Sequence, residues 1–303
     1  MTIRTYEVSD LIKTNCLVSI PTTMPPRSKK DKVATQEMLE KYGANSTQAA
    51  VIVSLFNPNN PLLKEIDKVK GLLRNTHTSL TQPWFDEGPR IITTRGYGAY
   101  KVKVEDLIAQ FYAAVEAFIR DYDNILLDAQ ANLHGLYRPE NYPTAEAIRQ
   151  LFSAKLVTDV IPDRADIRLD IDEDRMAKLV EDIRREEHNR VDNVFANIQQ
   201  TIVKEVTEMI EALDRHGVKL KDGARAQGFR DTLVPRIAKM VDMIKMTNIT
   251  NDPKVEELRD RIYSKLAMHD CEALREDDVL REEVKQDATE ILNDLDSYFG
   301  AKD

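Results

Sequence analysis

Residues 172–217 decide the fold, and their sequence is DEDRMAKLVEDIRREEHNRVDNVFANIQQTIVKEVTEMIEALDRHG. Apolar side chains recur through this stretch at Met176, Leu179, Ile183, Val191, Val194, Ile198, Ile202, Val206, Met209 and Leu213. Their average step is about 3.7 residues, nearer to the period of a straight α-helix than to that of a left-handed coiled coil. Glu187 interrupts the series. The pattern predicts one long amphipathic helix that begins at Asp172 and ends at Gly217.

The same periodicity runs through most of the remaining chain. A second apolar stripe, from Lys103 to Leu136, predicts an amphipathic helix on the order of 45–50 Å long. Ser46, Thr144 and Asp252–Pro253 are typical helix starts, and Gly43 is a typical helix end. Shorter helices are therefore expected over residues 35–43, 46–56, 62–80, 144–152, 229–247, 253–268 and 277–299.

Segments that favour strands are few and short. CLVSIP (16–21) is an apolar run that Pro21 ends, and it predicts a strand. The runs GPRIITT and AYKVKV flank Gly96–Tyr97–Gly98 and predict a hairpin with a Gly-containing loop. In ADIRLDI (165–171), apolar residues alternate with charged ones, which predicts another strand. Residues 21–32 and 219–231 are expected to be loops.

The expected fold class follows from these patterns. It is mainly α, with long amphipathic helices and a small antiparallel or mixed β-sheet. Residues 1–102 are expected to form an N-terminal region of helical hairpins and a small sheet. Residues 103–303 are expected to form an elongated helical domain with one inserted strand near 166–171. Long stripes are hard to bury within one chain, so the pattern also favours a homo-oligomer.

Composition limits the functions that are open to the chain of 303 residues. Its formal net charge is −9, which disfavours a dedicated nucleic-acid-binding protein because phosphate backbones are also negative. Cys16 and Cys271 have no partner spacing, so a reducing cytoplasm is expected rather than a disulfide framework. Since no apolar run approaches the roughly 18 residues of a membrane span, no membrane partner is expected.

Motifs for chemistry are scarce, so the sequence predicts no enzyme, no cofactor and no metal. HExxH, GxxxxGK[ST], GxGxxG and GxSxG are all absent. His188 with Asp192 could bind a metal, but arginines surround the pair and favour a solvated charged face. His269–Asp270–Cys271 could bring a thiol near an imidazole, although no third group is evident. DIDED (170–174) imitates a calcium loop, but negative charge at a helix start explains it better. A carboxylate-based activity without a linear motif stays open.

Two stretches are candidate contact surfaces. LTQPWFDEGPRIITTRGYGAY (80–100) contains the one tryptophan of the chain, and it is a structural junction, a partner surface or a small-molecule site. Its candidate partner-surface residues are Trp84, Phe85, Arg90, Tyr97 and Tyr100. The second stretch is a basic patch formed by Arg27, Lys29, Lys30 and Lys32. Such a patch is most often a solvated loop, and otherwise contacts nucleic acid or an acidic partner.

Three segments resemble a family of uncharacterised proteins of tailed phages. They are HTSLTQPWFDEGPRIITTRGYGAY (77–100), residues 111–152 and residues 228–258. The family is similar to a bacterial domain of unknown function encoded beside MoxR-type AAA+ ATPases and von Willebrand-A or cobaltochelatase-like proteins. The resemblance implies a viral protein in the cytoplasm of the infected bacterium or in a virion, acting through protein contacts. It implies no catalytic residues.

Three functional hypotheses follow. The first is a non-enzymatic phage-encoded helical protein that self-associates or scaffolds protein–protein contacts during infection. The second is an adaptor or regulator of an AAA+ ATPase, or an inhibitor of a host defence factor. The third is a nucleic-acid-associated protein that uses the basic patch.

Overall fold

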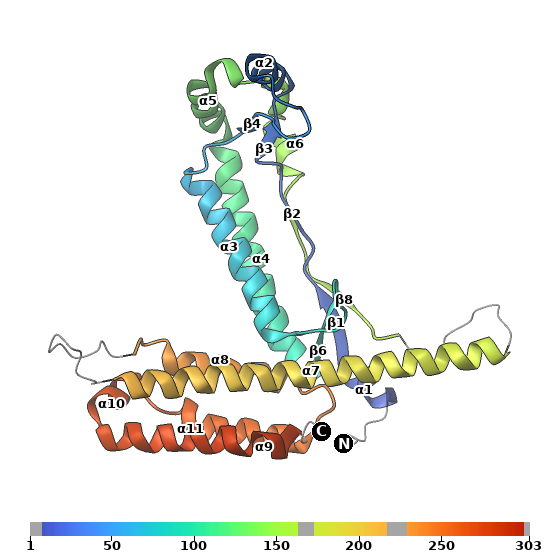
Figure 1. Cartoon of the computed structure of the whole chain (residues 1–303), viewed down its shortest axis with the longest axis vertical. Coiled ribbons are helices and arrows are strands. Elements are labelled where there is room, and N and C mark those ends of the chain that lie inside the picture. The colour runs from blue at the N-terminus through green and yellow to red at the C-terminus, as the bar shows by residue number, and fades with distance from the viewer. Residues whose placement is uncertain (1–7, 163–172, 217–228, 300–303) are drawn as a thin grey trace. The chain divides into compact units, whose positions relative to one another are not determined.

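The computed structural model describes residues 8–162, 173–216 and 229–299 (Figure 1). It is mainly helical with short strands in small sheets, as the sequence predicts. The chain divides into two compact units. Unit 1 contains Met1–Ser19, Thr78–Tyr100 and Thr158–Asp303, and unit 2 contains Ile20–His77 and Lys101–Val157. The expected division at residues 102–103 cuts the chain once, whereas each of these units combines segments that are distant in sequence.

The long helix predicted over 172–217 is present as α7 in unit 1. Its apolar stripe is buried from Val191 to Leu213, where it packs against α8 and α11. The expected ends, Asp172 and Gly217, lie outside the described residues. The helices of unit 1 are α1 (Val8–Thr14), α7 (Glu173–Arg215), α8 (Leu233–Thr247), α9 (Pro253–Ile262), the π-helix η4 (Tyr263–Ala267), α10 (Cys271–Glu276) and α11 (Asp278–Phe299).

Local capping explains where the C-terminal helices begin. The Asp252 carboxylate accepts a hydrogen bond from the Lys254 N–H, and Pro253 occupies the first turn of α9 as predicted. The helix expected over 253–268 is α9 continued by η4. The Asp277 carboxylate caps α11, because it accepts hydrogen bonds from two N–H groups in the first turn of that helix.

Unit 1 also holds a sheet with the strand order β5-β6-β1-β8. The strands are β1 (Asn15–Ser19), β5 (Gln82–Pro83), β6 (Arg90–Thr93) and β8 (Val157–Asp159). The strand predicted at 16–21 is confirmed as β1, which runs antiparallel to β6 and aligns Leu17 with Ile91. Asn15 links β1 to the helices, because its Nδ2 donates to Ile249 O at 2.8 Å. The strand predicted at 165–171 and most of the loop at 219–231 lie outside the described residues.

The hairpin predicted around Gly96–Tyr97–Gly98 is wrong. These residues form the first turns of α4 (Thr94–Arg120), and β6 pairs with β1 and β5 instead. The Gly96 N–H donates to Thr93 Oγ1 at 3.1 Å, so a threonine hydroxyl caps the helix. A Cβ built on Gly96 would lie 2.8 Å from Met246 Cγ and 3.0 Å from Met246 Cα. The glycine therefore serves a close approach between α4 and α8, rather than a turn.

Unit 2 contains helices and two small antiparallel sheets, β2 with β7 and β3 with β4. Its strands are β2 (Thr22–Thr23), β3 (Ser28–Lys30), β4 (Ile52–Ser54) and β7 (Ser153–Ala154). Its helices are α2 (Lys32–Tyr42), most of α3 (Pro61–Leu80) and of α4, α5 (Tyr122–Leu133), the 3₁₀ turns η1 (His134–Leu136) and η2 (Pro139–Asn141), and α6 (Ala145–Arg149). Gly43 ends α2 with a φ of 60°, and Thr144 caps α6, both as predicted.

Three predictions in unit 2 are wrong. The expected helix over 46–56 is replaced by turns and β4, because the β-branched residues Val51, Ile52 and Val53 favour the extended ladder with β3. The expected loop over 21–32 contains β2 and β3. The expected single helix from Lys103 to Leu136 is interrupted at Asp121, whose φ of −99° and ψ of 8° depart from helical geometry.

Aromatic side chains fill the centre of unit 2. The ring of Phe56 lies edge-on to Phe118 with centroids 5.8 Å apart, and edge-on to Tyr142 at 5.9 Å. Here Tyr122 is buried and Tyr142 is half-buried, and both direct their hydroxyls to backbone acceptors. Tyr122 donates to Pro143 O at 3.0 Å, and Tyr142 donates to Leu55 O at 2.9 Å. These bonds hold the segment after η2 against the strand and helices.

Gly96→Ala should destabilise the protein, because the new methyl group would overlap Met246. We expect the free energy of unfolding to fall by about 1–3 kcal/mol. Gly98→Ala is the matched control, since nothing lies within 4 Å of a Cβ at that position in the same helix. There, alanine should raise stability by about 0.5–1 kcal/mol. Urea unfolding followed by circular dichroism measures both variants. Equal effects would contradict the role of Gly96 in packing.

Alkaline pH should destabilise the folded protein because Tyr122 and Tyr142 lose their protons. Burial raises the pKa of each phenol from 10.0 to about 12. As the pH rises, the unfolded chain therefore loses these protons before the folded protein does. The free energy of unfolding should keep its whole value below pH 10 and decrease between pH 10 and about 12. Urea unfolding across this pH range should show a smaller decrease in the free energy of unfolding for Tyr142→Phe than for the unsubstituted protein. Tyr42→Phe, at an exposed tyrosine, is the control and should leave the loss unchanged.

Candidate functional site

The Trp84 segment contributes to both the core and the surface of unit 1. Trp84 is 2% exposed and belongs to the same core as Leu17 and Ile91, whereas Phe85 is 38% exposed. The guanidinium carbon of Arg190, on α7, lies 4.6 Å from the centroid of the Phe85 ring and 5.9 Å from that of Trp84. This is a cation–π distance, so the segment is held against α7 while one aromatic ring meets solvent.

The other candidate residues of this segment are engaged inside unit 1. Arg90 donates from Nε to Thr81 Oγ1 at 2.6 Å and from Nη2 to Thr81 O at 2.7 Å. The Tyr97 and Thr158 hydroxyls share a hydrogen bond of 2.9 Å. Tyr100 is fully buried, and burial raises the pKa of its phenol well above the usual range. Burial likewise lowers the pKa of Arg90. Of the five candidate residues, only Phe85 is exposed.

The predicted basic patch surrounds β3 in unit 2, and half of it is already paired. Arg27 makes two bonds to the Asp67 carboxylate, at 2.5 and 2.9 Å. Lys29 Nζ donates to Asn141 Oδ1 at 2.7 Å. The side chains of Lys30 and Lys32 are exposed and make no hydrogen bond or ion pair with the described part of the chain. These two lysines are the part of the patch that an acidic partner can use.

The metal hypotheses gain no geometric support. His188 Nδ1 lies 2.8 Å from Arg184 O, so the ring bonds within its own helix. Across residues 8–162, 173–216 and 229–299, no group of three His, Cys, Asp or Glu side chains is placed to hold a metal ion. Most of the DIDED run lies outside those residues.

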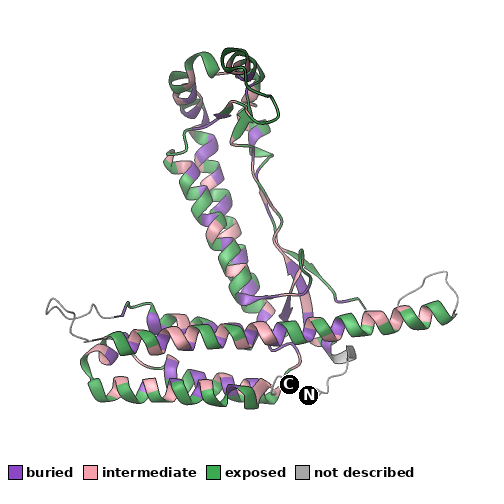
Figure 2. Ribbon diagram, viewed as in Figure 1, coloured by how far each residue is buried: buried purple, intermediate pink, exposed green. Residues whose placement is uncertain are grey.

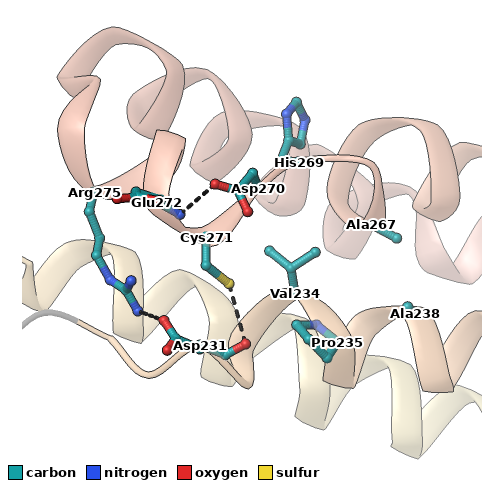
Figure 3. A pocket seen from close by; sticks show the side chains of 10 residues that line it. All are labelled: Asp231, Val234, Pro235, Ala238, Ala267, His269, Asp270, Cys271, Glu272 and Arg275. Carbon is teal, nitrogen blue, oxygen red and sulfur yellow. Dashed lines mark hydrogen bonds and ion pairs between the residues drawn. The ribbon is translucent and has the colours of Figure 1, made fainter.

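A pocket of about 770 Å³ opens in unit 1, between the start of α8 and the turn that joins η4 to α10 (Figure 3). Its lining residues are Asp231, Val234, Pro235, Ala238, Ala267, His269, Asp270, Cys271, Glu272 and Arg275. Small apolar side chains form one wall, and three carboxylates stand among the polar residues. Arg275 is tied down, because its Nη2 donates to Asp231 Oδ1 at 2.5 Å and to Phe229 O at 2.7 Å.

The pocket gathers His269, Asp270 and Cys271, but their side chains point in different directions (Figure 3). Cys271 Sγ donates to the backbone oxygen of Asp231 at 3.5 Å. His269 Nε2 lies 3.0 Å from Lys265 O, and the Asp270 carboxylate caps α10. A cysteine nucleophile needs a base within hydrogen-bond reach of its sulfur, and this imidazole faces away from the thiol. The triplet therefore shapes the pocket and shows no thiol–imidazole pair.

Sequence reasoning identified this triplet and missed the rest of the pocket. Arg275 and Asp231 are 44 positions apart and meet only because α10 returns to the start of α8. Val234, Pro235 and Ala238 belong to a regular helix pattern, which carries no sign of a cavity. The one local signal was Asp270, a residue type that caps helices and so marks the turn at the pocket rim.

Comparisons with protein-family models, with curated proteins and with solved structures find no match to this chain. The resemblance to the phage family is therefore still an expectation. Among the described helices, none combines the length and apolar character needed to cross a bilayer.

Substitutions at Trp84 and Phe85 should distinguish a core side chain from a surface side chain by their effect on stability. Trp84→Ala removes a buried indole and should lower the free energy of unfolding by about 3–5 kcal/mol. Phe85→Ala removes an exposed ring with one cation–π contact and should cost about 1 kcal/mol or less. Chemical denaturation followed by circular dichroism measures both. If Phe85→Ala were as destabilising as Trp84→Ala, the ring would be a packing element and not a free surface.

Proposed function

We propose that this chain is a non-enzymatic helical protein that works through protein–protein contacts, including association with copies of itself. The uneven burial of α7 carries the proposal (Figure 2). Its stripe is fully buried from Val191 onward, whereas Met176, Leu179 and Ile183 continue the stripe and are only half-buried. Apolar surface left partly open along a helix favours association with another protein surface.

Other surfaces support a role in binding. Phe85 exposes an aromatic ring beside Arg190, and aromatic and arginine side chains are enriched where proteins meet. The pocket beside α10 is open and has an apolar wall. The resemblance to a phage family, which implies protein contacts during infection of a bacterium, points the same way.

A binding module for another protein is the second candidate. Such a module could be an adaptor or regulator of an AAA+ ATPase, or an inhibitor of a host defence factor. The exposed Phe85 ring suits this role as well as it suits self-association. Nucleic-acid association is supported less, because Arg27 and Lys29 already have partners and the net charge is −9.

Light scattering coupled to size-exclusion chromatography distinguishes the two candidates. Self-association should give a mass above the 34.7 kDa of one chain, and the mass should increase from low to high micromolar concentration. A constant mass of one chain over that range would contradict self-association. That result would favour the binding module, and co-purification from phage-infected cells would then search for its partner.

A further inference from the structure

The start of α2 lies beside strand β4 in unit 2, and the two segments together expose apolar and basic side chains. Ile52 is 69% exposed and Val33 is 55% exposed. Lys30 stands opposite Ile52 in the β3–β4 ladder, so the two side chains share a face of the sheet. Lys32 directly precedes Val33 at the start of α2. We call Lys30, Lys32, Val33 and Ile52 the basic surface.

The backbone beneath the basic surface is well held. The Asp31 N–H donates to Val51 O at 3.0 Å, which ties the start of α2 to β4. The Asp31 carboxylate accepts a hydrogen bond from the Ala34 N–H at 2.9 Å and pairs with Arg138 Nε at 3.2 Å. The exposed lysines and apolar residues therefore stand on a fixed frame, which reduces the entropy lost when a partner binds.

The pocket in unit 1 has the opposite charge and a similar apolar content. Its apolar wall comes from Val234, Pro235, Ala238 and Ala267. Asp270 and Glu272 are exposed at its edge, and neither makes an ion pair among the described residues. The Arg275 guanidinium forms its ion pair with Asp231 at 2.5 Å, and it interacts with Glu272 only through space. A complementary partner would bring cations that carry aliphatic stems.

The net charge of the whole chain does not show that the two units differ in charge. The segments of unit 2 carry 15 Lys and Arg against 13 Asp and Glu, whereas the segments of unit 1 carry 28 against 39. The acidic excess thus belongs to unit 1 alone. Each copy of the chain offers one surface of each sign, and opposite potentials draw such surfaces together.

We propose that the basic surface of one copy docks into the pocket of a second copy. The lysine stems lie along the apolar wall, and the ammonium groups of Lys30 and Lys32 approach Asp270 and Glu272. The proposal rests on the self-association proposed above and names the surfaces that carry it. Each copy carries both surfaces, so two copies can dock reciprocally in a closed dimer, or successive copies can dock in rings or open chains.

Charge exchange between the two surfaces tests the proposal. The basic-surface variant is Lys30→Glu with Lys32→Glu. The pocket variant is Glu272→Lys with Glu276→Lys, since Glu276 lies one turn further along the same exposed side of α10. Light scattering should show the unsubstituted protein at a mass above that of one chain, increasing with concentration. For each variant alone, the association constant should fall by about tenfold or more, because like charges then face each other. An equal mixture of the two variants should recover the large species, because both contacts are again between opposite charges.

The controls separate this proposal from the proposed function. Lys70→Glu with Lys103→Glu makes the same change in net charge at exposed lysines of unit 2 outside the basic surface, and should leave the mass unchanged. Circular dichroism should show the same helicity in all variants.

A monomeric unsubstituted protein would contradict self-association itself. An unsubstituted oligomer that persists in the basic-surface variant, or variants that fail to recover on mixing, would overturn only the docking proposal. Binding of a labelled DNA duplex that is lost in the basic-surface variant would assign the surface to nucleic acid and also overturn it.

Discussion

The burial of one helix stripe is the constraint on which unit 1 depends. From Val191 to Leu213 the side chains of the α7 stripe are almost completely removed from solvent, against α8 and α11. Each such side chain contributes roughly 1.5–3 kcal/mol on burial, so the stripe is a large part of the stability of this unit. The close contact of Gly96 with Met246 then brings the first turn of α4 to α8, and Asn15 brings β1 to the segment after α8.

Unit 2 is stabilised by a different kind of core. Its core is a cluster of aromatic rings whose hydroxyls reach backbone acceptors, as at Tyr122 and Tyr142. Its strands are too short to form a sheet that is stable alone, so the aromatic cluster and the ion pair of Asp31 with Arg138 hold the outer segments. Because the strands are so short, apolar residues such as Ile52 are exposed beside lysines. A surface of this kind suits contact with a partner, and the acidic, apolar pocket of unit 1 has matching chemistry.

The errors of sequence reasoning occur where local preference and tertiary contact disagree. Residues 96–98 have the composition of a turn, yet the glycine there is needed because α8 approaches closely. At Asp121 the apolar stripe continues without a break, so periodicity alone could not reveal the end of α4. At Ile52, alternation was too short to be told from a helix pattern, and the register with Lys30 decides in favour of a strand.

The sequence by itself determined the helix-rich class, the long α7 stripe, the caps at Asp252 and Thr144 and the strand at β1, because periodicity and capping act between near neighbours. Only the tertiary structure decided that Trp84 and Tyr100 are buried while Phe85 is exposed, and that Arg27 and Lys29 are already paired. It also decided that Asp231 and Arg275 meet beside Cys271. These outcomes depend on segments tens of residues apart in the chain, and no local pattern encodes which of those segments will touch.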